Sequence, residues 1–239
     1  MKSIILAGGL GSRLGEITNK IPKSLVRVGS KPVLDYQIEL LARHGVKEIF
    51  ILTGYHSKQI HEYCGDGSRW GVHVQCIEEV GPAGTAGALR GAEALLADEA
   101  FLVMSGDIIT NLNIKNLILW HETKENSHAT FVLQNVPYRF DADFVELDEA
   151  SVVRRVFLRP HTNNQIVKPM GIASVYIFSN KIFSFIPKHG KFDIERDILS
   201  KLLSANAMVY GYVAKEYMKD IGTPERLQEA QHELHLMRT

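Results

Sequence analysis

Long apolar runs, an excess of charge of one sign and clustered cysteines are all missing from this chain of 239 residues. No run reaches the roughly 18 apolar residues of a spanning helix, and the N-terminus enters a strand without a secretion signal. We therefore expect a cytoplasmic protein with no membrane partner. The 27 Lys and Arg residues balance the 27 Asp and Glu residues, so no overall field attracts nucleic acid. Any recognition of phosphate must be local.

The two cysteines, Cys64 and Cys76, have neither the spacing of a metal site nor the density of a disulfide scaffold. We expect both to be reduced and buried or half-buried. The chain also lacks repeats, low-complexity tracts and evident linkers, and its length suits one sizeable core. We therefore predict a single domain over residues 1–239.

The most informative stretch follows residues 4–7, an apolar run long enough for one buried strand. Three glycines within four positions end this strand, and glycine loops let backbone N–H groups approach phosphate oxygens. Arg13 then supplies a charge with bidentate reach, and Lys23 supplies a compact point charge. A plain glycine turn with two solvated basic residues is the alternative interpretation.

Two better-known phosphate loops do not fit this stretch. The dinucleotide pattern requires glycine at position 14, where Leu14 stands, and the P-loop pattern ends in Gly-Lys-Ser/Thr. An NAD-dependent oxidoreductase is therefore disfavoured. The loop is a third kind, with side-chain cations of its own.

Apolar strands alternate with helices through the first 105 residues, which predicts a doubly wound α/β sheet with its ligand beyond the carboxyl ends of the strands. We expect strands at residues 4–7, 47–53, 72–78 and 101–105, and helices at 32–44, 57–64 and 84–96. The rest of the chain predicts helices at 117–121, 192–203 and 224–237, strands at 129–136, 171–178 and 208–213, a hairpin of 144–147 with 152–157, and a loop at 159–168. Thr223 should cap the last helix, with Pro224 at its first position. The prediction is a central mixed sheet with an inserted hairpin lobe, in two halves over 1–110 and 111–225.

Two carboxylates, Asp107 and Asp220, each follow an apolar strand in this interpretation. Mg²⁺ takes one or two protein carboxylates and completes its shell with substrate oxygens and water. Taken singly, either aspartate would more often be a solvated loop or cap residue. Together with Arg13 and Lys23, they supply the cations and metal ligands that attack on the α-phosphorus of a nucleoside triphosphate requires.

These motifs resemble the sugar-1-phosphate nucleotidylyltransferases, also called nucleotide-sugar pyrophosphorylases. The matching residues are Gly8, Gly9, Gly11, Ser12, Arg13, Leu14, Pro22 and Lys23, then Gly84-Thr85-Ala86-Gly87, Gly106-Asp107 and Asp220-Ile221-Gly222-Thr223-Pro224. The resemblance implies a Rossmann-like three-layer α/β/α sandwich with a mixed, mostly parallel sheet. It also implies an NTP and a sugar 1-phosphate as substrates, which react to give an NDP-sugar and pyrophosphate. The mannose and manno-heptose 1-phosphate guanylyltransferase-like branch is most similar.

The resemblance also implies a role for each matching residue. Arg13 would hold the leaving β- and γ-phosphates, Lys23 would stabilise the α-phosphate, and Asp107 and Asp220 would bind Mg²⁺. The residues implied to bind the nucleotide are Leu6, Ala7, Gly8, Gly9, Gly11, Ser12, Glu79, Gly84 and Thr85. The Gly-Thr-Ala-Gly form favours GTP, although this segment on its own could be merely a helix start.

The sequence departs from the family where the sugar is bound. Many members have Glu-Lys-Pro followed by a strand that begins Asn-Ala-Gly-x-Tyr, whereas this chain has Leu158-Arg159-Pro160 and Ile172-Ala173-Ser174-Val175-Tyr176. Arg159 or Lys168 would bind the sugar phosphate, with Ser174 beside it, or both cations would be solvated loop residues. Residues 138–146, the loop Arg159-Pro160-His161 and residues 192–199 resemble the manno-heptose branch.

Three questions stay open at this point. Another base or hexose 1-phosphate would fit the same motifs, and so would a non-catalytic domain that binds nucleotide sugars. The sequence is compatible with a monomer or a homo-oligomer.

Overall fold

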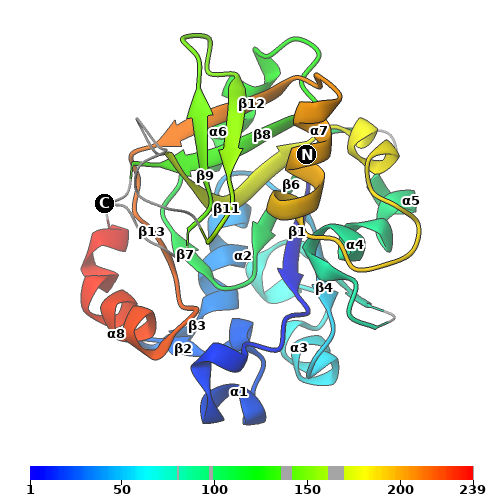
Figure 1. Cartoon of the computed structure of the whole chain (residues 1–239). Helices are drawn as coiled ribbons and strands as arrows, with labels where there is room; N and C mark the ends of the chain where they lie inside the picture. The colour runs from blue at the N-terminus through cyan, green and yellow to red at the C-terminus, as the bar shows by residue number, and fades with distance from the viewer. Residues whose placement is uncertain (80, 97–98, 136–141, 161–169, 239) are drawn as a thin grey trace. The chain divides into compact units, whose positions relative to one another are not determined.

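The computed structural model describes residues 1–79, 81–96, 99–135, 142–160 and 170–238 (Figure 1). The chain divides into two compact units, which are described separately. Unit 1 comprises Met1–Pro82, Val103–Lys115 and Glu216–Thr239, and unit 2 comprises Ala83–Leu102 and Asn116–Lys215. Residues 83–102 of the first expected half thus belong to unit 2, and the C-terminal segment belongs to unit 1.

Unit 1 is built on parallel strands. β1 (Lys2–Ala7) pairs with β4 (Glu48–Thr53), and β4 pairs in turn with β5 (His73–Glu78), all in parallel. The end of β6 (Phe101–Ser105) lies on the other side of β1. Ile4 and Ile5 are fully buried, as are most residues of β4, because parallel strands are covered on both faces. The predicted strand–helix alternation is confirmed here (Figure 1).

The helices of unit 1 follow their apolar periodicity. α2 (Val33–Arg43) buries the predicted stripe of Val33, Leu34, Ile38 and Leu41, and α3 (Ser57–Cys64) buries Ile60 and Cys64. Both cysteines are free, with Cys64 buried and Cys76 half-buried, as expected.

The C-terminal segment joins unit 1 through a small sheet. β13 (Met218–Asp220) pairs antiparallel with β7 (Ile108–Thr110), and α8 (Pro224–His232) follows. Thr223 caps α8 as predicted, since its Oγ1 accepts a hydrogen bond of 3.3 Å from the Arg226 N–H. The apolar cluster beneath these elements comprises Leu14, Val26, Val28, Val33, Ile109, Ile221, Leu227 and Ala230.

Unit 2 contains a mixed sheet centred on β11 (Met170–Phe178). β11 pairs antiparallel with β8 (Ala129–Gln134) and with β9 (Phe144–Leu147), and β9 and β11 lie side by side in Figure 1. β8 pairs in parallel with β12 (Val209–Ala214), and β9 forms the predicted hairpin with β10 (Val153–Phe157).

Two helices predicted for unit 2 are interrupted. The helix expected at 84–96 is divided into α4 (Gly84–Arg90) and α5 (Glu93–Leu96). The helix expected at 192–203 begins as a π-helical turn, Ile194–Ile198, before α7 (Leu199–Ser204). The Asp193 carbonyl accepts both the Asp197 and Ile198 N–H groups, so this turn is wider than an α-helical turn.

The remaining elements are short. They are α1 (Glu16–Lys20), α6 (Ile114–Glu122), β2 (Arg27–Val28), β3 (Lys31–Pro32) and 3₁₀ turns at Ser12–Leu14, Lys23–Leu25, Ser68–Trp70, Asn180–Ser184 and Glu233–Arg238. In the part of the chain that the structure describes, no helix combines the length and apolar character that crossing a membrane requires.

Candidate active site

The glycine loop begins where β1 ends at Ala7. A Cβ on Gly8 would meet the carboxylate of Glu79, so a larger residue at this position would require the Glu79 side chain to move. Gly9 and Gly11 continue the loop, and the Gly11 carbonyl accepts a hydrogen bond of 3.0 Å from the Thr18 hydroxyl. The chain then turns into Ser12–Leu14, which places Arg13 after the glycines.

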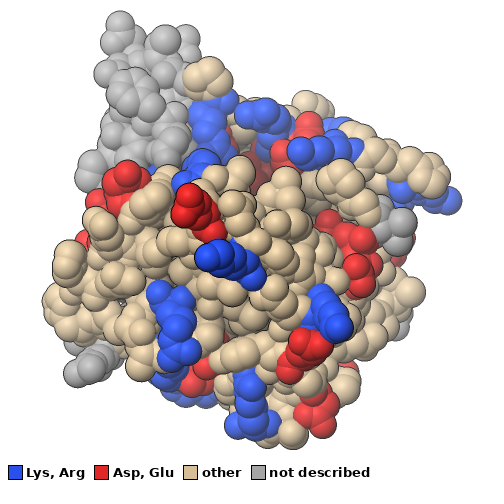
Figure 2. All heavy atoms as spheres, turned by 90° about the horizontal axis from the view of Figure 1, so that it is seen from below, with Lys and Arg blue, Asp and Glu red and all other residues tan. Residues whose placement is uncertain are grey.

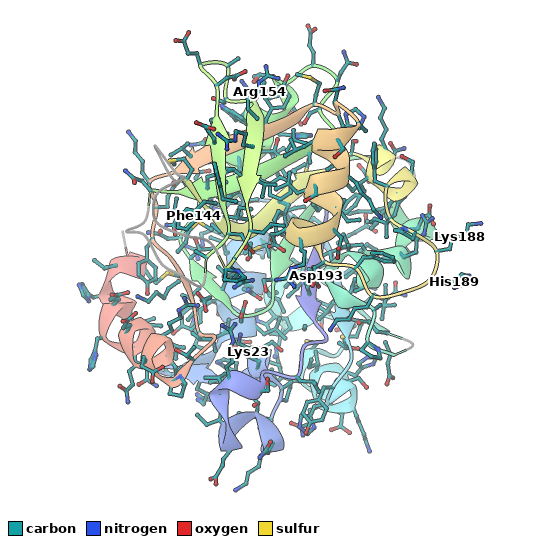
Figure 3. All side chains as sticks on the ribbon, in the orientation of Figure 1. Lys23, Phe144, Arg154, Lys188, His189 and Asp193 are labelled. Atoms are coloured by element: carbon teal, nitrogen blue, oxygen red, sulfur yellow. The ribbon has the colours of Figure 1, made fainter. Side chains whose placement is uncertain are left out.

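Gly222 marks the place where the predicted charged residues meet. A Cβ on Gly222 would lie 2.6 Å from Asp220 Oδ1, 3.1 Å from Arg13 Nη2 and 3.5 Å from Lys23 Nζ. Lys23, labelled in Figure 3, also donates a hydrogen bond to Asp107 Oδ2. Unit 1 thus brings together all four residues that the sequence singled out for phosphate and metal binding.

Asp107 lies in the turn after β6. Its carboxylate accepts hydrogen bonds from Lys23 Nζ and, at 2.8 Å, from Ser105 Oγ. Burial by itself would raise the pKa of Asp107, but the charge of Lys23 and these hydrogen bonds outweigh it and hold the pKa below its ordinary value. The carboxylate is therefore ionised at neutral pH and available to a cation.

Asp220 is held by the residues that follow it. Its Oδ1 accepts from the Gly222 N–H at 2.9 Å and from Arg226 Nη1 at 2.8 Å, and its Oδ2 lies 2.9 Å from the same nitrogen. We expected Asp220 to follow an apolar strand. This expectation is wrong, because Asp220 is itself the last residue of the short strand β13. Pairing of β13 with β7 brings it near Asp107, and the Ile221 N–H donates to the Asp107 carbonyl at 3.0 Å.

Sequence reasoning missed two supporting residues. No sequence pattern marked Arg226 as a site residue, because its pairing with Asp220 depends on how the chain turns into α8. Gln37 gave a weak one, since it is a polar residue on the apolar face of α2. Its Nε2 donates to the Ser105 carbonyl at 2.7 Å and to the Ile108 carbonyl at 2.9 Å, which fixes the turn that carries Asp107.

Glu79 follows β5, and its carboxylate lies against Gly8. Burial raises the pKa of Glu79 to about 7, so the group is partly protonated at neutral pH. In the folded protein the ionised form is therefore disfavoured. The contribution of the protonated Glu79 to the free energy of unfolding is fully present below pH 4.5 and is lost as the pH rises through about 7.

Replacing Glu79 with Gln should raise Tm at pH 8.5 and change it little at pH 5, because glutamine has no charge to bury. For a chain of this size, about 2–4 °C is expected per kcal/mol. Thermal denaturation of both proteins across this pH range measures the difference. A difference in Tm that does not grow with pH would contradict the raised pKa of Glu79.

The two carboxylates fit a magnesium ion. Mg²⁺ needs only one or two protein carboxylates, and each aspartate here already lies beside a cation, Lys23 or Arg226, that a metal would partly replace. Among the described residues, no group of three or more His, Cys, Asp and Glu side chains is arranged to hold a metal ion.

Unit 2 contains the other predicted residues. Gly84 begins α4 with φ of +74°, and Thr85 ties α4 to the π-helical turn, since its Oγ1 accepts from the Ile194 N–H at 2.9 Å. Asp193, labelled in Figure 3, accepts from the Thr85 N–H at 3.3 Å. Arg159 pairs with Asp143 at 3.4 Å, Ser174 belongs to β11, and Lys168 lies outside the described residues.

The face of the molecule drawn in Figure 2 shows no second candidate site. On the face that Figure 2 shows, basic and acidic side chains alternate between uncharged residues, without a broad area of one sign. This agrees with the balanced composition and with local recognition of phosphate.

Comparison with known proteins identifies the family. The family model described as nucleotidyl transferase matches residues 2–236. The chain belongs to this nucleotidyl transferase family. The match covers the glycine loop, both aspartates and the residues of unit 2 named above, and it confirms the resemblance found in the sequence.

Individual nucleotidyl transferases resemble the chain over nearly all its length. The "Low-salt glycan biosynthesis nucleotidyltransferase Agl11" of Haloferax volcanii is 30% identical over 96% of the chain and 65% of its own length. The "D-glycero-alpha-D-manno-heptose 1-phosphate guanylyltransferase" of Aneurinibacillus thermoaerophilus is 27% identical over 98% of both. The solved structure of HddC from Yersinia pseudotuberculosis with GMP-PN has a TM-score of 0.80 and 29% identity, over 98% of this chain and 99% of that one.

The relatives differ in length and in named substrate. The chain spans 60–65% of the length of several curated relatives. The names of the relatives include uridylyl-, guanylyl- and cytidylyltransferases. The structural match confirms the predicted α/β class with a Rossmann-like mixed sheet.

Proposed function

We propose that this nucleotidyl transferase transfers a nucleoside monophosphate from an NTP to a sugar 1-phosphate and releases pyrophosphate. The observation that carries the proposal is the gathering of Arg13, Lys23 and Asp220 around Gly222, with Asp107 paired to Lys23. A site for a neutral ligand has no need of two cations beside two carboxylates.

The reaction requires little of the protein beyond positioning and charge. An oxygen of the sugar 1-phosphate forms a bond to the α-phosphorus, and the bond from that phosphorus to the bridging oxygen of the β-phosphate breaks. The attacking oxygen is already anionic, so no general base is needed. Arg13 and the loop amides would hold the departing pyrophosphate, and Lys23 would balance the charge at the α-phosphate.

Asp107 and Asp220 would bind Mg²⁺. When bound, the metal would neutralise phosphate charge and fix the orientation of the triphosphate. The residues around the two carboxylates prepare them for this role, because Lys23 and Ser105 keep Asp107 ionised and Arg226 fixes the orientation of Asp220.

GTP is the proposed nucleotide, and Glu79 gives a physical reason. An ionised carboxylate only accepts hydrogen bonds, and the Watson–Crick edge of guanine offers two adjacent donors, N1–H and N2–H. Uracil and thymine offer one donor between two acceptors, which suits a carboxylate less well. The manno-heptose and mannose guanylyltransferases among the relatives support the same choice.

A manno-configured sugar 1-phosphate, either mannose or manno-heptose, is the proposed acceptor. It would place the product in polysaccharide or glycoconjugate biosynthesis, and a cytoplasmic location belongs to the same proposal. The support is the similarity to the heptose enzyme over 98% of both chains.

A substrate panel tests the function. The purified chain would be offered GTP, ATP, CTP, UTP and dTTP, each with mannose, manno-heptose and glucose 1-phosphates and Mg²⁺, and released pyrophosphate would be measured. Turnover with any pair supports the reaction class, and the best pair decides the substrates. Nucleotide binding without any pyrophosphate release would instead support a non-catalytic domain.

Replacing Glu79 with Gln should lower kcat/KM for GTP about 10-fold relative to that for UTP, because the amide offers only one acceptor oxygen to guanine. In the wild type, KM for GTP should fall as the pH rises through about 7, where Glu79 becomes ionised. Kinetics between pH 6 and 8.5 test both points, with exposed Glu62→Gln as the matched control. An unchanged ratio of kcat/KM for GTP to kcat/KM for UTP would show that Glu79 does not bind the base.

A further inference from the structure

Two thiols meet inside unit 1. Cys64 is the last residue of α3, and Cys76 lies in β5. A side-chain hydrogen bond joins the two sulfur atoms, and both cysteines are free of any disulfide. The proposed transfer reaction uses neither thiol, so the pair has no role in it.

The backbone between the two cysteines brings them together. The Asp66 carbonyl accepts from the Val74 N–H at 2.8 Å, and the Gly67 carbonyl accepts from the Val72 N–H at 3.4 Å. Packing at Gly67 is close as well, since a Cβ there would lie 2.6 Å from Val74 Cγ2. These contacts fold the segment after α3 back along β5, so the end of α3 lies opposite the second half of β5.

The two thiols differ in exposure and in acidity. Cys64 is 3% exposed, whereas Cys76 is half-buried. The hydrogen bond from Cys64 lowers the pKa of Cys76 against the opposing effect of burial, while the same bond and burial raise the pKa of Cys64. Because a thiolate is the reactive form of cysteine, Cys76 is the sulfur that reacts first, with the Cys64 thiol beside it.

We infer that Cys64 and Cys76 form an oxidation site, at which a peroxide converts the two thiols to a reversible disulfide that restricts the glycine loop. The Cys76 thiolate attacks one peroxide oxygen, the O–O bond breaks and hydroxide leaves, which gives a sulfenic acid. The Cys64 sulfur then attacks the Cys76 sulfur and loses its proton, the S–O bond breaks, and water leaves as the S–S bond forms. The peroxide is reduced, and the two thiols together lose two hydrogen atoms.

Both elements that this bond would join also contact the glycine loop. β5 leads into Glu79, whose carboxylate lies against Gly8. The turn before α3 reaches the same glycine, since the Tyr55 N–H donates to the Gly8 carbonyl at 3.4 Å and a Cβ on Gly54 would lie 2.8 Å from that oxygen. A covalent bond between α3 and β5 would therefore limit how far the loop can adjust to a bound triphosphate.

Mass spectrometry of the protein treated with hydrogen peroxide tests the oxidation site. The wild type should lose the mass of two hydrogen atoms, a digest should contain one peptide that joins Cys64 to Cys76, and dithiothreitol should reverse both changes. Failure to join the two cysteines in the folded protein, or a disulfide that forms only between two chains, would overturn the site.

Single-cysteine variants test the order of the two steps. Cys64→Ser should stop at the sulfenic acid of Cys76, which dimedone traps, whereas the Cys64 thiol of Cys76→Ser should stay unmodified. If Cys64→Ser does not fold, as judged by Tm, Cys64→Ala replaces it. Trapping of a sulfenic acid on Cys64 in Cys76→Ser, and none on Cys76, would overturn the assignment of Cys76 as the reacting thiolate.

The effect on the loop rests on the proposed function and is measured separately. KM for GTP should rise about 3–10-fold in the oxidised wild type and return on reduction, because the loop can no longer adjust to the triphosphate. Cys76→Ser, treated with peroxide in the same way, controls for oxidation of the six methionines and should keep its KM. An unchanged KM in the oxidised wild type would overturn the restriction of the loop.

Failure of the proposed function would look different. In that case no substrate pair would release pyrophosphate, although the disulfide would still form and be seen by mass. Calorimetric titration of GTP with Mg²⁺ into the reduced and oxidised wild type would then replace KM. Weaker binding to the oxidised form would support the restriction of the loop, and equal binding or none would overturn it.

Discussion

Replacing Asp107 with Asn should lower kcat by about 10²–10³-fold while leaving the protein folded. The amide keeps the size of the side chain and can still accept from Ser105, so the turn after β6 should survive. The substitution removes the Asp107 carboxylate, which Lys23 keeps ionised and which would bind Mg²⁺. Pyrophosphate release with the best substrate pair measures the effect, and circular dichroism checks the fold.

Asp66→Asn is a matched control for this change. Asp66 is an exposed residue of unit 1 whose carboxylate accepts the Ser68 N–H at 2.9 Å, a bond that asparagine can keep. It should leave kcat unchanged. A kcat for Asp107→Asn within about threefold of the wild type would show that Asp107 takes no part in metal binding. Titration with Mn²⁺ should also show weaker binding to the folded Asp107→Asn variant than to the control.

The local parts of the fold were predictable because they depend on periodicity and turn chemistry. The apolar run of β1, the buried stripe of α2 and the Thr223 cap of α8 are each specified within a few residues. The alternation of strands and helices then requires a parallel sheet for unit 1. Asp107 followed from the same argument, since it comes directly after a buried strand.

What the sequence did not contain is information about contacts between distant segments. Asp220 and Asp107 are brought together by the pairing of β13 with β7, two strands of three residues that have no periodic signal. Arg226 reaches Asp220 only because α8 begins where it does. The motif order suggested that these residues belong together, but their geometry depends on tertiary structure.

The backbone irregularities of unit 2 could not be predicted from the sequence either. Period 3.6 at residues 192–203 cannot distinguish an α-helix from a π-helical turn, because one extra residue per turn changes the pattern little. The bulge in β11 is equally hidden, since Ser174 is an ordinary residue in an unusual conformation. Residue propensities therefore predict where helices and strands occur. Their local backbone irregularities depend on specific tertiary contacts such as the hydrogen bond from Tyr176 to Glu195.

Replacing Lys23 with Met should lower kcat by about 10²–10³-fold and also shift the acid limb of the pH–rate profile to higher pH. The first effect follows from losing the charge that would balance the α-phosphate. The second follows from Asp107, whose pKa is held low mainly by Lys23 against the opposing effect of burial. Without the lysine, burial should raise that pKa above its ordinary value, and protons would compete with the metal.

The pH dependence distinguishes these two roles of Lys23. Pyrophosphate release between pH 5.5 and 9 should recover partly at high pH in Lys23→Met, where Asp107 is ionised again, and the remaining deficit measures the direct effect on phosphate. NMR of protein labelled with ¹³C at aspartate should show the rise in the pKa of Asp107. Exposed Lys20→Met is the control and should match the wild type. A lower kcat with an unshifted acid limb would mean that Lys23 acts on the phosphate alone, so that another group keeps Asp107 ionised.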